Sequence, residues 1–376
     1  MMGVPKYLFQ SISFFAFVFC SVQTYAQSNS TFIPQTHIEI RGAKWYINGE
    51  PTLKGKTWRN YTIEGLLPNA RMVQGIYDDL NPETRVQWKY NDTGKWDADR
   101  NTQEFLAAMD SWAEHGLLAF TINLQGGSPY GYSKDQPWIN SAIDENGELR
   151  KDYMTRLSQI IEKADRLGMV VILGVFYFGQ DDRIKDEAGV IKAVDNSTNW
   201  VLDKGYKNVI IEIANECDNS KYDHSIIKQL RVAELIKRAQ SYKRGSYRLL
   251  VSTSFNGGSI PNDPVIEAAD FILIHGNGVK QYAGLNNMAN IIRNKESYTP
   301  KPIVNNEDDH FDFDQPFNNF VASTSAYVSW GFFDYRLKEE GFDFGYQSMP
   351  VNWRISSPRK KAFFDLLKEM TSGDKL

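Results

Sequence analysis

The sequence has 376 residues, a formal net charge of −4 and no basic stripe or arginine-rich tract, which argues against a nucleic acid partner. Aromatic residues make up 13% of the chain, with nine Trp and 19 Tyr. A large core explains most of them, and the excess also suits a cleft in which flat aromatic faces contact sugar rings.

The N-terminal segment has the features of a secretory signal peptide. Lys6 supplies a positive charge, an apolar run from Leu8 to Val22 follows it, and the segment ends in the small-residue pattern Thr24-Tyr25-Ala26. This order predicts a signal peptide over residues 1–26, cleaved near Gln27, and an exported protein that is secreted or periplasmic. Because the apolar run is shorter than the roughly 20 residues that span a bilayer, we expect no membrane insertion.

Cysteine usage fits the same interpretation. A lipoprotein anchor would use Cys20, but the bulky Phe19 before it suits that processing poorly. Removal of the leader leaves Cys217 as the remaining cysteine, so we expect no intramolecular disulfide. Residues 27–376 have a length suited to one large α/β unit, and we expect them to form a single catalytic domain.

The first predicted element of this domain is a small β-hairpin. Ile38-Glu39-Ile40 and Trp45-Tyr46-Ile47 alternate in the manner of short strands, and Asn48-Gly49 is a turn signal. We expect these two strands to be joined through Asn48-Gly49.

The rest of the chain alternates short apolar runs with amphipathic stretches, as βα units around a parallel sheet do. The predicted strands are Thr52–Trp58, Leu117–Leu124, Met169–Phe178, Asn208–Glu216, Arg248–Ser254, Phe271–His275, Ile303–Glu307 and Trp330–Tyr335. The clearest predicted helices are Thr102–His115, Arg150–Leu167 and Pro358–Met370. Eight strands favour a (β/α)8 TIM barrel of the α/β class. A doubly wound open sheet is the alternative, but Lys54-Gly55-Lys56 after the first strand is not a glycine-rich phosphate turn.

Two connections are too long to be plain loops. One runs from Arg59 to Arg100, after the first predicted strand, and the other runs from Arg336 to Ser357, after the eighth. Both carry several Trp and Tyr residues. Loops that follow strands lie on the face where barrel enzymes hold their active sites, so these two would shape a cleft, brace the barrel, or do both.

Two glutamates end strands that lie across the barrel from each other. Alternation places Glu212, Ala214 and Glu216 on one face of the fourth strand, with Glu216 at the rim, and Glu307 ends the seventh strand. Glycosidic cleavage needs two facing carboxyl groups: one protonates the leaving oxygen, and the other attacks the anomeric carbon or activates a water that does. We therefore predict Glu216 and Glu307 as the catalytic pair. A separation near 5 Å would indicate retention of configuration, and a longer one inversion.

The segment Glu212-Ile213-Ala214-Asn215-Glu216 resembles the fourth-strand motif of clan A glycoside hydrolases, above all of the cellulase family, family 5. The resemblance implies Glu216 as acid/base, Glu307 as nucleophile and a retaining reaction. It also implies that Asn215 hydrogen-bonds the sugar hydroxyl next to the reacting carbon. His275, at the end of the sixth strand, is similar to the histidine that the clan carries there.

Several positions depart from the family 5 pattern. Cys217 stands where the family usually has Pro, and the second strand, Thr121-Ile122-Asn123-Leu124, lacks the arginine that supports the nucleophile. The third strand ends in Phe176-Tyr177-Phe178 in place of a histidine, and Asn277 takes the place of a tyrosine. The chain therefore resembles a divergent family of the clan, and the resemblance does not carry over a substrate.

Further sugar contacts are expected from side chains at the other strand ends. The candidates are Trp58, Asn123, Gln125, Tyr177, Gln180, Asp181, Asn256, Asn277, Asp334 and Tyr335. Trp58 is the best candidate for a stacking platform. Tyr335 or Tyr177 is the candidate for replacing the tyrosine near the nucleophile.

The segment Glu307-Asp308-Asp309-His310 raises the alternative of a metal site. Adjacent residues of an extended strand point to opposite faces, so four of them would not all bind one ion, and we expect neither a metal nor another cofactor. The clustered negative charges need a cation or hydrogen-bond donors, for which His275, Arg71 and Arg336 are the candidates.

These features predict an exported retaining glycoside hydrolase that cleaves β-glycosidic bonds in a polysaccharide or oligosaccharide by double displacement. An exo-acting β-glycosidase or a transglycosylase would use the same residues. A carbohydrate-binding barrel without activity is the alternative outside the enzymes, and the presence of both glutamates argues against it.

Overall fold

The computed structural model describes residues 1–3, 32–280 and 282–375. The chain divides into two units, Met1–Phe32 and Ile33–Leu376, and the second carries the elements described below. The predicted signal peptide, apart from its first three residues, lies outside the described residues.

Eight parallel strands form a barrel, as the sequence predicts. They are β6 (Asn69–Arg71), β7 (Ala119–Asn123), β8 (Val170–Tyr177), β9 (Val209–Asn215), β10 (Val251–Ser252), β11 (Ile272–His275), β12 (Ile303–Glu307) and β13 (Gly331–Phe332). The order β13-β6-β7-β8-β9-β10 is continuous, and β11 pairs with β12. Parallel bridges join β12 to the β13 region, and the Asp270 amide donates to the Val251 carbonyl at 3.0 Å across the remaining seam. The (β/α)8 barrel is confirmed.

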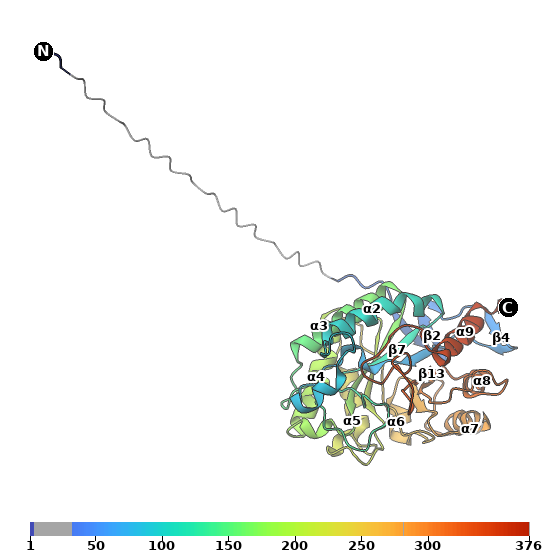
Figure 1. The fold of residues 1–376 in the computed structure, drawn as a ribbon. Helices are drawn as coiled ribbons and strands as arrows, with labels where there is room; N and C mark the ends of the chain where they lie inside the picture. Colours follow the sequence, from blue (N-terminus) through green and yellow to red (C-terminus); the bar gives the residue numbers. More distant parts are fainter. Residues whose placement is uncertain (4–31, 281, 376) are drawn as a thin grey trace. The chain divides into compact units, whose positions relative to one another are not determined.

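Each barrel strand is followed by a helix, and Figure 1 shows these helices around the outside of the strands. They are α2 (Ala98–Glu114), α3 (Lys151–Arg166), α4 (Glu187–Asp203), α5 (Val232–Ser241), α6 (Asp263–Ala268), α7 (Tyr282–Arg293), α8 (Asn319–Ser325) and α9 (Pro358–Ser372). Side-chain caps fix several helix starts: Asp97 accepts from the Arg100 amide at α2, and Ser357 precedes Pro358 at α9. Short extra turns are α1 (Pro82–Arg85), η1 (Val73–Ile76), η2 (Val86–Trp88), η3 (Asp181–Arg183) and η4 (Ser225–Ile227).

The first barrel strand is not the one that the sequence predicts. The segment Thr52–Trp58 contributes only β4 (Lys56–Trp58), which pairs antiparallel with β5 (Tyr61–Thr62) and β14 (Asp374–Lys375) in a separate sheet. The true first strand is β6, which reads Asn-Ala-Arg and is fully buried. Apolar patterning could not identify it because its interior side chains are polar.

The N-terminal hairpin exists, but its turn differs from the expected one. β1 (Ile38–Arg41) pairs with β2 (Lys44–Ile47) through Gly42 and Ala43, whereas Asn48-Gly49 leads from β2 to β3 (Glu50–Pro51). Ile38 and Trp45 pack with residues at the starts of the barrel strands, among them Ala119, Val170 and Phe271. The hairpin therefore closes the N-terminal end of the barrel.

The aromatic side chains of the two long connections are structural. Tyr77, Trp88, Tyr90 and Trp96 are buried, and the rings of Tyr90 and Trp96 stack with centroids 5.6 Å apart. In the connection after β13, Tyr346 and Trp353 are buried and stack with centroids 6.1 Å apart. Of the two roles considered for these aromatics, bracing the barrel is the one that the structure shows. The first connection runs from Met72 to Asp97, because it starts after β6.

Other boundaries moved less. β10 and β13 have two residues each, whereas the predicted segments Arg248–Ser254 and Trp330–Tyr335 have more. The helices predicted at 102–115, 150–167 and 358–370 are α2, α3 and α9, shifted by a few residues at their ends. The largest difference is at the start of α2, which begins four residues earlier than predicted because Asp97 caps it.

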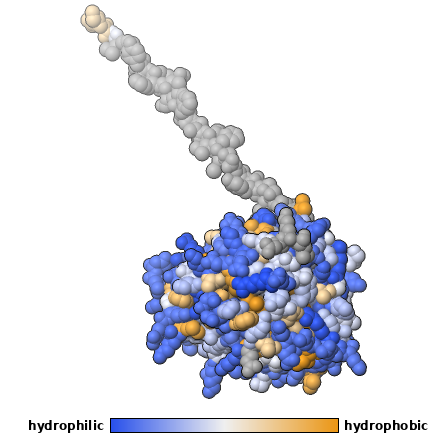
Figure 2. Space-filling model, turned by 90° about the vertical axis from the view of Figure 1, so that its right-hand side faces the viewer, coloured by the Kyte–Doolittle hydropathy of each residue, from blue (hydrophilic) through white to orange (hydrophobic). Residues whose placement is uncertain are grey.

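The surface carries mixed polarity. Figure 2 shows one face on which hydrophilic side chains predominate and apolar groups are scattered among them. In the described part of the chain, no helix is both long enough and apolar enough to cross a bilayer.

Candidate active site

The two predicted catalytic glutamates meet at the C-terminal end of the barrel. Glu216 follows β9, and Glu307 ends β12, three places further around the ring. A carboxylate oxygen of each glutamate and a ring nitrogen of His275 all lie within 4.8 Å of one another. The two carboxyl groups thus face each other at a short separation.

The backbone at Glu216 is in the left-handed region, with a φ of 56°. Non-glycine residues pay roughly 1–2 kcal/mol for this conformation. Ser254, just after β10, stabilises it: its hydroxyl oxygen accepts from the Glu216 amide at 2.9 Å, and its carbonyl accepts from the Cys217 amide at 2.9 Å. The end of β10 therefore sets the direction in which the Glu216 side chain leaves β9.

A β-bulge positions Glu307. In the pairing of β11 with β12, Ile274 lies opposite Asn305 and His275 lies opposite Glu307, so that Asn306 is the extra residue. A bulge breaks the alternation of side chains along a strand. As a result, both neighbours reach the barrel interior: the Asn306 amide donates to Glu212 at 3.4 Å, and Glu307 meets Arg71.

Glu307 is held by one ion pair and one hydrogen bond. Arg71, at the end of β6, places Nε 2.7 Å from Glu307 Oε2, and the Asn277 side-chain amide donates to Oε1 at 2.7 Å. The side chain of Arg71 is 1% exposed and that of Glu307 is 7% exposed. Burial alone lowers the pKa of Arg71, but the charges of Glu307 and Glu212 raise it overall. The guanidinium therefore stays charged and forms a buried ion pair with Glu307.

Glu216 lies in a different electrostatic environment. Burial raises the pKa of its carboxyl group, the hydrogen bond with His275 at 3.0 Å opposes that shift, and the charge of Glu307 adds to it. The net direction is upward. A raised pKa is what a general acid needs in order to keep its proton near neutral pH.

His275 connects the two glutamates. Its Nδ1 lies 3.0 Å from Glu216 and 3.7 Å from Glu307. Burial alone lowers the pKa of the imidazole, but the charge of Glu307 and the hydrogen bond with Glu216 outweigh burial and raise this pKa. The charge on His275 therefore depends on both glutamates.

Arg71 and Asn277 fill the two roles that the departures from family 5 leave open. The arginine beside Glu307 comes from the first barrel strand instead of the second. The donor on Glu307 is the amide of Asn277, where the family usually has a tyrosine. Arg71 also donates to Asn215 Oδ1 at 2.9 Å, which leaves the Asn215 side-chain amide for another acceptor. Arg336 instead donates to carbonyls of Ser348 and Pro350.

A cavity of about 480 Å³ opens above this pair. It is lined by Ser128, Tyr132, Ser133, Lys134, Gln136, Tyr177, Phe178, Glu216, Asn219, Lys221, Asn256, Gly257, Asn277 and Glu307. Among the predicted sugar contacts, Tyr177, Asn256 and Asn277 are in this lining. Asn215 and His275 lie next to this lining. Asn215 directly precedes Glu216 and accepts a hydrogen bond from Arg71, and His275 is hydrogen-bonded to Glu216.

Three predicted contacts lie elsewhere. Trp58 is on β4, is 4% exposed, donates to Glu369 at 2.9 Å and packs against Phe320, so its place in the separate sheet rules out the stacking platform that we expected. Asp334 is buried and paired with Arg359 at 2.7 Å. Tyr335 packs against Tyr132, behind the cavity wall, and does not contact Glu307.

Four more candidates are buried near the strand ends, outside the cavity lining. Gln125 accepts from the Tyr177 amide and donates to the Gln180 carbonyl. Gln180 donates to the Trp138 carbonyl, and Asp181 accepts from two backbone amides after β9. Asn123 is buried with neither side-chain atom hydrogen-bonded within the described residues. None of these four lines the cavity.

One wall of the cavity is formed by a segment that was not among the predicted contacts. Five lining residues come from Ser128–Gln136, in the connection between β7 and α3. The Tyr132 hydroxyl donates to Asp309 at 3.0 Å, and the Lys221 ammonium donates to the Ser133 carbonyl at 3.4 Å. The only sequence signal was the presence of two tyrosines in a glycine- and serine-rich connection that follows a strand.

We expected no metal at residues 307–310 because side chains alternate along an extended strand. That alternation does not continue beyond Glu307. β12 ends at Glu307, and ligand atoms of Asp308, Asp309 and His310 lie within 4.8 Å of one another. Asp308, however, accepts hydrogen bonds at both oxygens, from His310 and Asn319 at one and from Asn305, Asn319 and Trp330 at the other. This carboxylate ties the loop after β12 to its surroundings.

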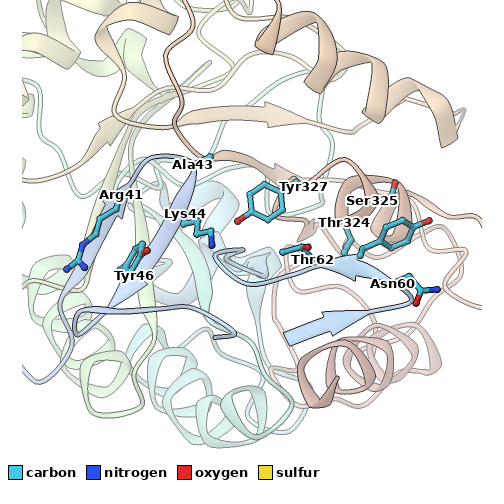
Figure 3. A pocket seen from close by; sticks show the side chains of 10 residues that line it. Arg41, Ala43, Lys44, Tyr46, Asn60, Thr62, Thr324, Ser325 and Tyr327 are labelled. Carbon is cyan, nitrogen blue, oxygen red and sulfur yellow. The ribbon is translucent and has the colours of Figure 1, made fainter. Parts of the chain in front are cut away.

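A second concavity, of about 680 Å³, lies at the other end of the barrel, between the N-terminal hairpin and the end of α8 (Figure 3). Figure 3 shows Tyr46 beside Arg41 and Tyr327 facing Lys44. No lining residue in the described chain is a carboxylic acid or a histidine, so this concavity lacks the pair of carboxyl groups that glycosidic cleavage uses.

Comparison with known proteins supports the barrel. No protein-family model and no curated protein matches the sequence. A family 5 glycoside hydrolase from Bacteroides vulgatus matches with a TM-score of 0.54 at 13% identity, over 90% of this chain and 72% of that one. The endo-1,4-β-mannanase from Rhizomucor miehei matches with a TM-score of 0.55 at 11% identity, over 89% of this chain and 99% of that one. The chain has the fold of a glycoside hydrolase barrel.

A third, longer structure from Bacteroides vulgatus matches with a TM-score of 0.54 at 13% identity, and the chain covers 59% of its length. At these identities the likeness establishes the barrel fold. The predicted relationship to the family 5 barrels is thus confirmed at the level of the fold, while the chemistry has to be argued from the site.

Proposed function

We propose that the protein is a retaining glycoside hydrolase that cleaves β-glycosidic bonds of an oligosaccharide or polysaccharide. The observation that carries this proposal is the close approach of Glu216 and Glu307: their carboxylate oxygens lie within 4.8 Å of each other, Glu307 is paired with Arg71, and burial raises the pKa of Glu216. Retaining enzymes hold their two carboxyl groups about 5–5.5 Å apart, and inverting enzymes hold them farther apart to admit a water.

The reaction follows from the charges. Glu307, ionised beside Arg71, attacks the anomeric carbon and forms a glycosyl ester, while Glu216 gives its proton to the leaving oxygen as the glycosidic bond breaks. Glu216, now a carboxylate, takes a proton from water, and the hydroxide oxygen displaces Glu307 from the anomeric carbon. The double displacement regenerates both groups.

The neighbouring residues position these groups. Arg71 and Asn277 fix the two oxygens of Glu307, and Arg71 also holds Asn215 with its amide free to donate to a sugar hydroxyl. Tyr177, whose pKa is raised by burial and by the nearby Glu307, stays a neutral phenol at the cavity wall. These contacts supply orientation, on which the rate of such a reaction depends.

We further propose that the protein is exported through the signal peptide predicted over residues 1–26. A secreted or periplasmic enzyme would meet polysaccharide outside the cytoplasm. The leader and its cleavage near Gln27 are tested by N-terminal sequencing of the protein recovered from the producing cell.

The function is tested by incubating the protein with a panel of polysaccharides and their oligosaccharides. β-1,4-Mannan and β-1,4-glucan come first, because the structural neighbours include β-mannanases and endoglucanases. We expect release of reducing ends from at least one member of the panel, and loss of that release in Glu307→Gln. Binding without hydrolysis by the wild-type protein would instead indicate a carbohydrate-binding barrel.

A further inference from the structure

The cavity above the glutamates is lined from one part of the barrel mouth. Apart from Ser128–Gln136, its lining residues follow or end β8, β9, β10, β11 and β12. Within the described residues, none comes from the ends of β6 or β13, or directly from the end of β7. These three strands are neighbours in the ring, so one side of the mouth is covered.

The cover is the segment Gly126–Pro129, which follows β7. Gln74, after β6, donates its side-chain amide to the carbonyls of Gly127 and Ser128 at 3.1 and 3.3 Å. From the other side, the Met349 amide, after β13, donates to the Pro129 carbonyl at 2.8 Å. The segment is buried and is hydrogen-bonded to connections from both neighbouring strands.

Close packing shows that this cover fills the space over these strands. A Cβ at Gly126 would lie 1.8 Å from the Asn140 amide nitrogen, and a Cβ at Gly127 would lie 2.5 Å from the Gln347 amide nitrogen. Real Cβ atoms do not approach so closely. The space between Gly126–Gly127 and the side chains of Asn140 and Gln347 is therefore filled.

The following residues form the wall at which the cavity ends. On the β12 side, the Tyr132 hydroxyl donates to Asp309 at 3.0 Å. On the side of β8 and β9, the Gln136 amide donates to the Phe178 carbonyl at 2.8 Å, and Lys221 donates to the Ser133 carbonyl at 3.4 Å. The wall is thus attached on both sides of the Glu216–Glu307 pair.

We infer that the substrate cleft is closed at this wall and open toward β10 and β11, so that the enzyme acts at a chain end. This inference rests on the proposed function. Asn256, Gly257 and Asn277 line the open side. A chain that ran through the mouth in both directions would collide with the wall, whereas a chain end fits against it.

The order of the chemical steps decides which end enters. In a double displacement the leaving sugar departs while the other sugar is still bound to Glu307 as an ester. A leaving group at the closed end would be trapped behind that ester, so it must lie on the open side. The closed end therefore holds the sugar that Glu307 attacks, and a short product is removed from the non-reducing end.

The test uses the wild-type protein and a hexasaccharide, from the panel of the previous section, that is fluorescently labelled at its reducing end. We expect the first labelled product to have a single length. Shorter labelled products should appear only later, each shorter than the one before by the same number of sugars. A mixture of labelled lengths from the first turnovers would overturn the inference and leave the hydrolase proposal intact. No cleavage of any hexasaccharide would overturn both.

Two substitutions test the wall itself. Tyr132→Ala removes the ring and the bond to Asp309, and Lys221→Met removes the tie to Ser133. We expect each to raise the fraction of internal cuts among the first products several-fold. Tyr130→Phe is the matched control, because the Tyr130 hydroxyl bonds to Gln87 outside the cavity lining. An unchanged product pattern in both wall variants, or the same change in the control, would contradict this role.

Discussion

Glu216 and Glu307 are close neighbours with different surroundings, and this difference gives each of them its chemistry. Arg71 stabilises the charge of Glu307, whereas burial of Glu216 penalises its charge. Burial and the neighbouring charge of Glu307 both raise the pKa of Glu216 and so favour its protonated form.

The raised pKa of Glu216 predicts how stability depends on pH. In the unfolded chain a glutamate ionises near pH 4.3, roughly. The folded protein holds the proton to higher pH, so this contribution to stability is present below the unfolded pKa and is lost as the pH rises through the folded pKa. The side chain in Glu216→Gln cannot ionise, so the variant does not lose this stability as the pH rises.

We therefore expect Glu216→Gln to have a higher Tm than the wild type at neutral pH, with the difference vanishing near about pH 4. Thermal unfolding followed by circular dichroism across this range measures it. A Tm of the variant below that of the wild type at neutral pH would show that Glu216 is held as a carboxylate.

The acid/base role of Glu216 has its own test. Glu216→Ala should lower turnover about 10²–10⁴-fold on a substrate with a poor leaving group. With an activated aryl glycoside, added azide should restore turnover, because a small anion can replace the carboxylate in the second displacement. If azide leaves the rate of Glu216→Ala unchanged, the assignment is weakened.

At the scale of elements, the end of β10 positions the end of β9. Ser254→Ala removes the acceptor for the Glu216 amide at a left-handed backbone position, a loss worth about 0.5–1.5 kcal/mol. We expect kcat to fall while KM stays near the wild-type value, since Ser254 is outside the cavity lining. Ser252→Ala, two residues earlier and within β10 itself, is the control. Equal effects of both substitutions on kcat would point to a general weakening of β10.

The N-terminal hairpin contributes stability from the opposite end of the barrel. Trp45 is fully buried against the starts of the strands, with its ring 5.2 Å from that of Phe271. Trp45→Ala should lower the free energy of unfolding by about 3–5 kcal/mol, measured by urea denaturation. Its turnover at a temperature well below its Tm should match the wild type. A large loss of turnover in the folded variant would contradict a purely structural role for the hairpin.

Elements with strong patterns could be predicted from the sequence, and short polar ones could not. β8 and β9 are continuous apolar runs, and their segments were identified. β6 has only Asn69, Ala70 and Arg71, whose polar side chains bond within the barrel, so neither periodicity nor apolar content marks it. For the same reason Arg71, although it was among the candidate cations for the negative charges at 307–309, could not be assigned to a barrel strand.

The site shows the same division. Glu216, Glu307, Asn215 and His275 follow from a local motif and from the ends of clear strands, and the structure brings them together. Tyr132 and Lys221 reach the cavity through contacts across the barrel mouth, between connections far apart in the sequence. Trp58 was misplaced because it was assigned to a barrel strand that does not exist.

In the whole molecule, the hairpin that stabilises the barrel and the two glutamates of the candidate site lie at opposite ends of the barrel. The hairpin closes the N-terminal end with apolar packing, and the glutamates sit at the C-terminal end. The connections after β6, β7 and β13 cover one side of the C-terminal end, and buried aromatic side chains help to fix the first and the last of them. In the proposed reaction, loops thereby set substrate access, while the two glutamates belong to the strand ends.

The central claim is that Glu307 forms a covalent bond with the sugar. The most direct measurement is mass spectrometry of the protein after reaction with an activated 2-deoxy-2-fluoro glycoside of the sugar that the panel identifies, followed by peptide mapping. We expect a mass increase of one glycosyl unit, located on the peptide that contains Glu307 and absent in Glu307→Gln. An adduct on another residue, or hydrolysis that inverts the anomeric configuration, would contradict the account.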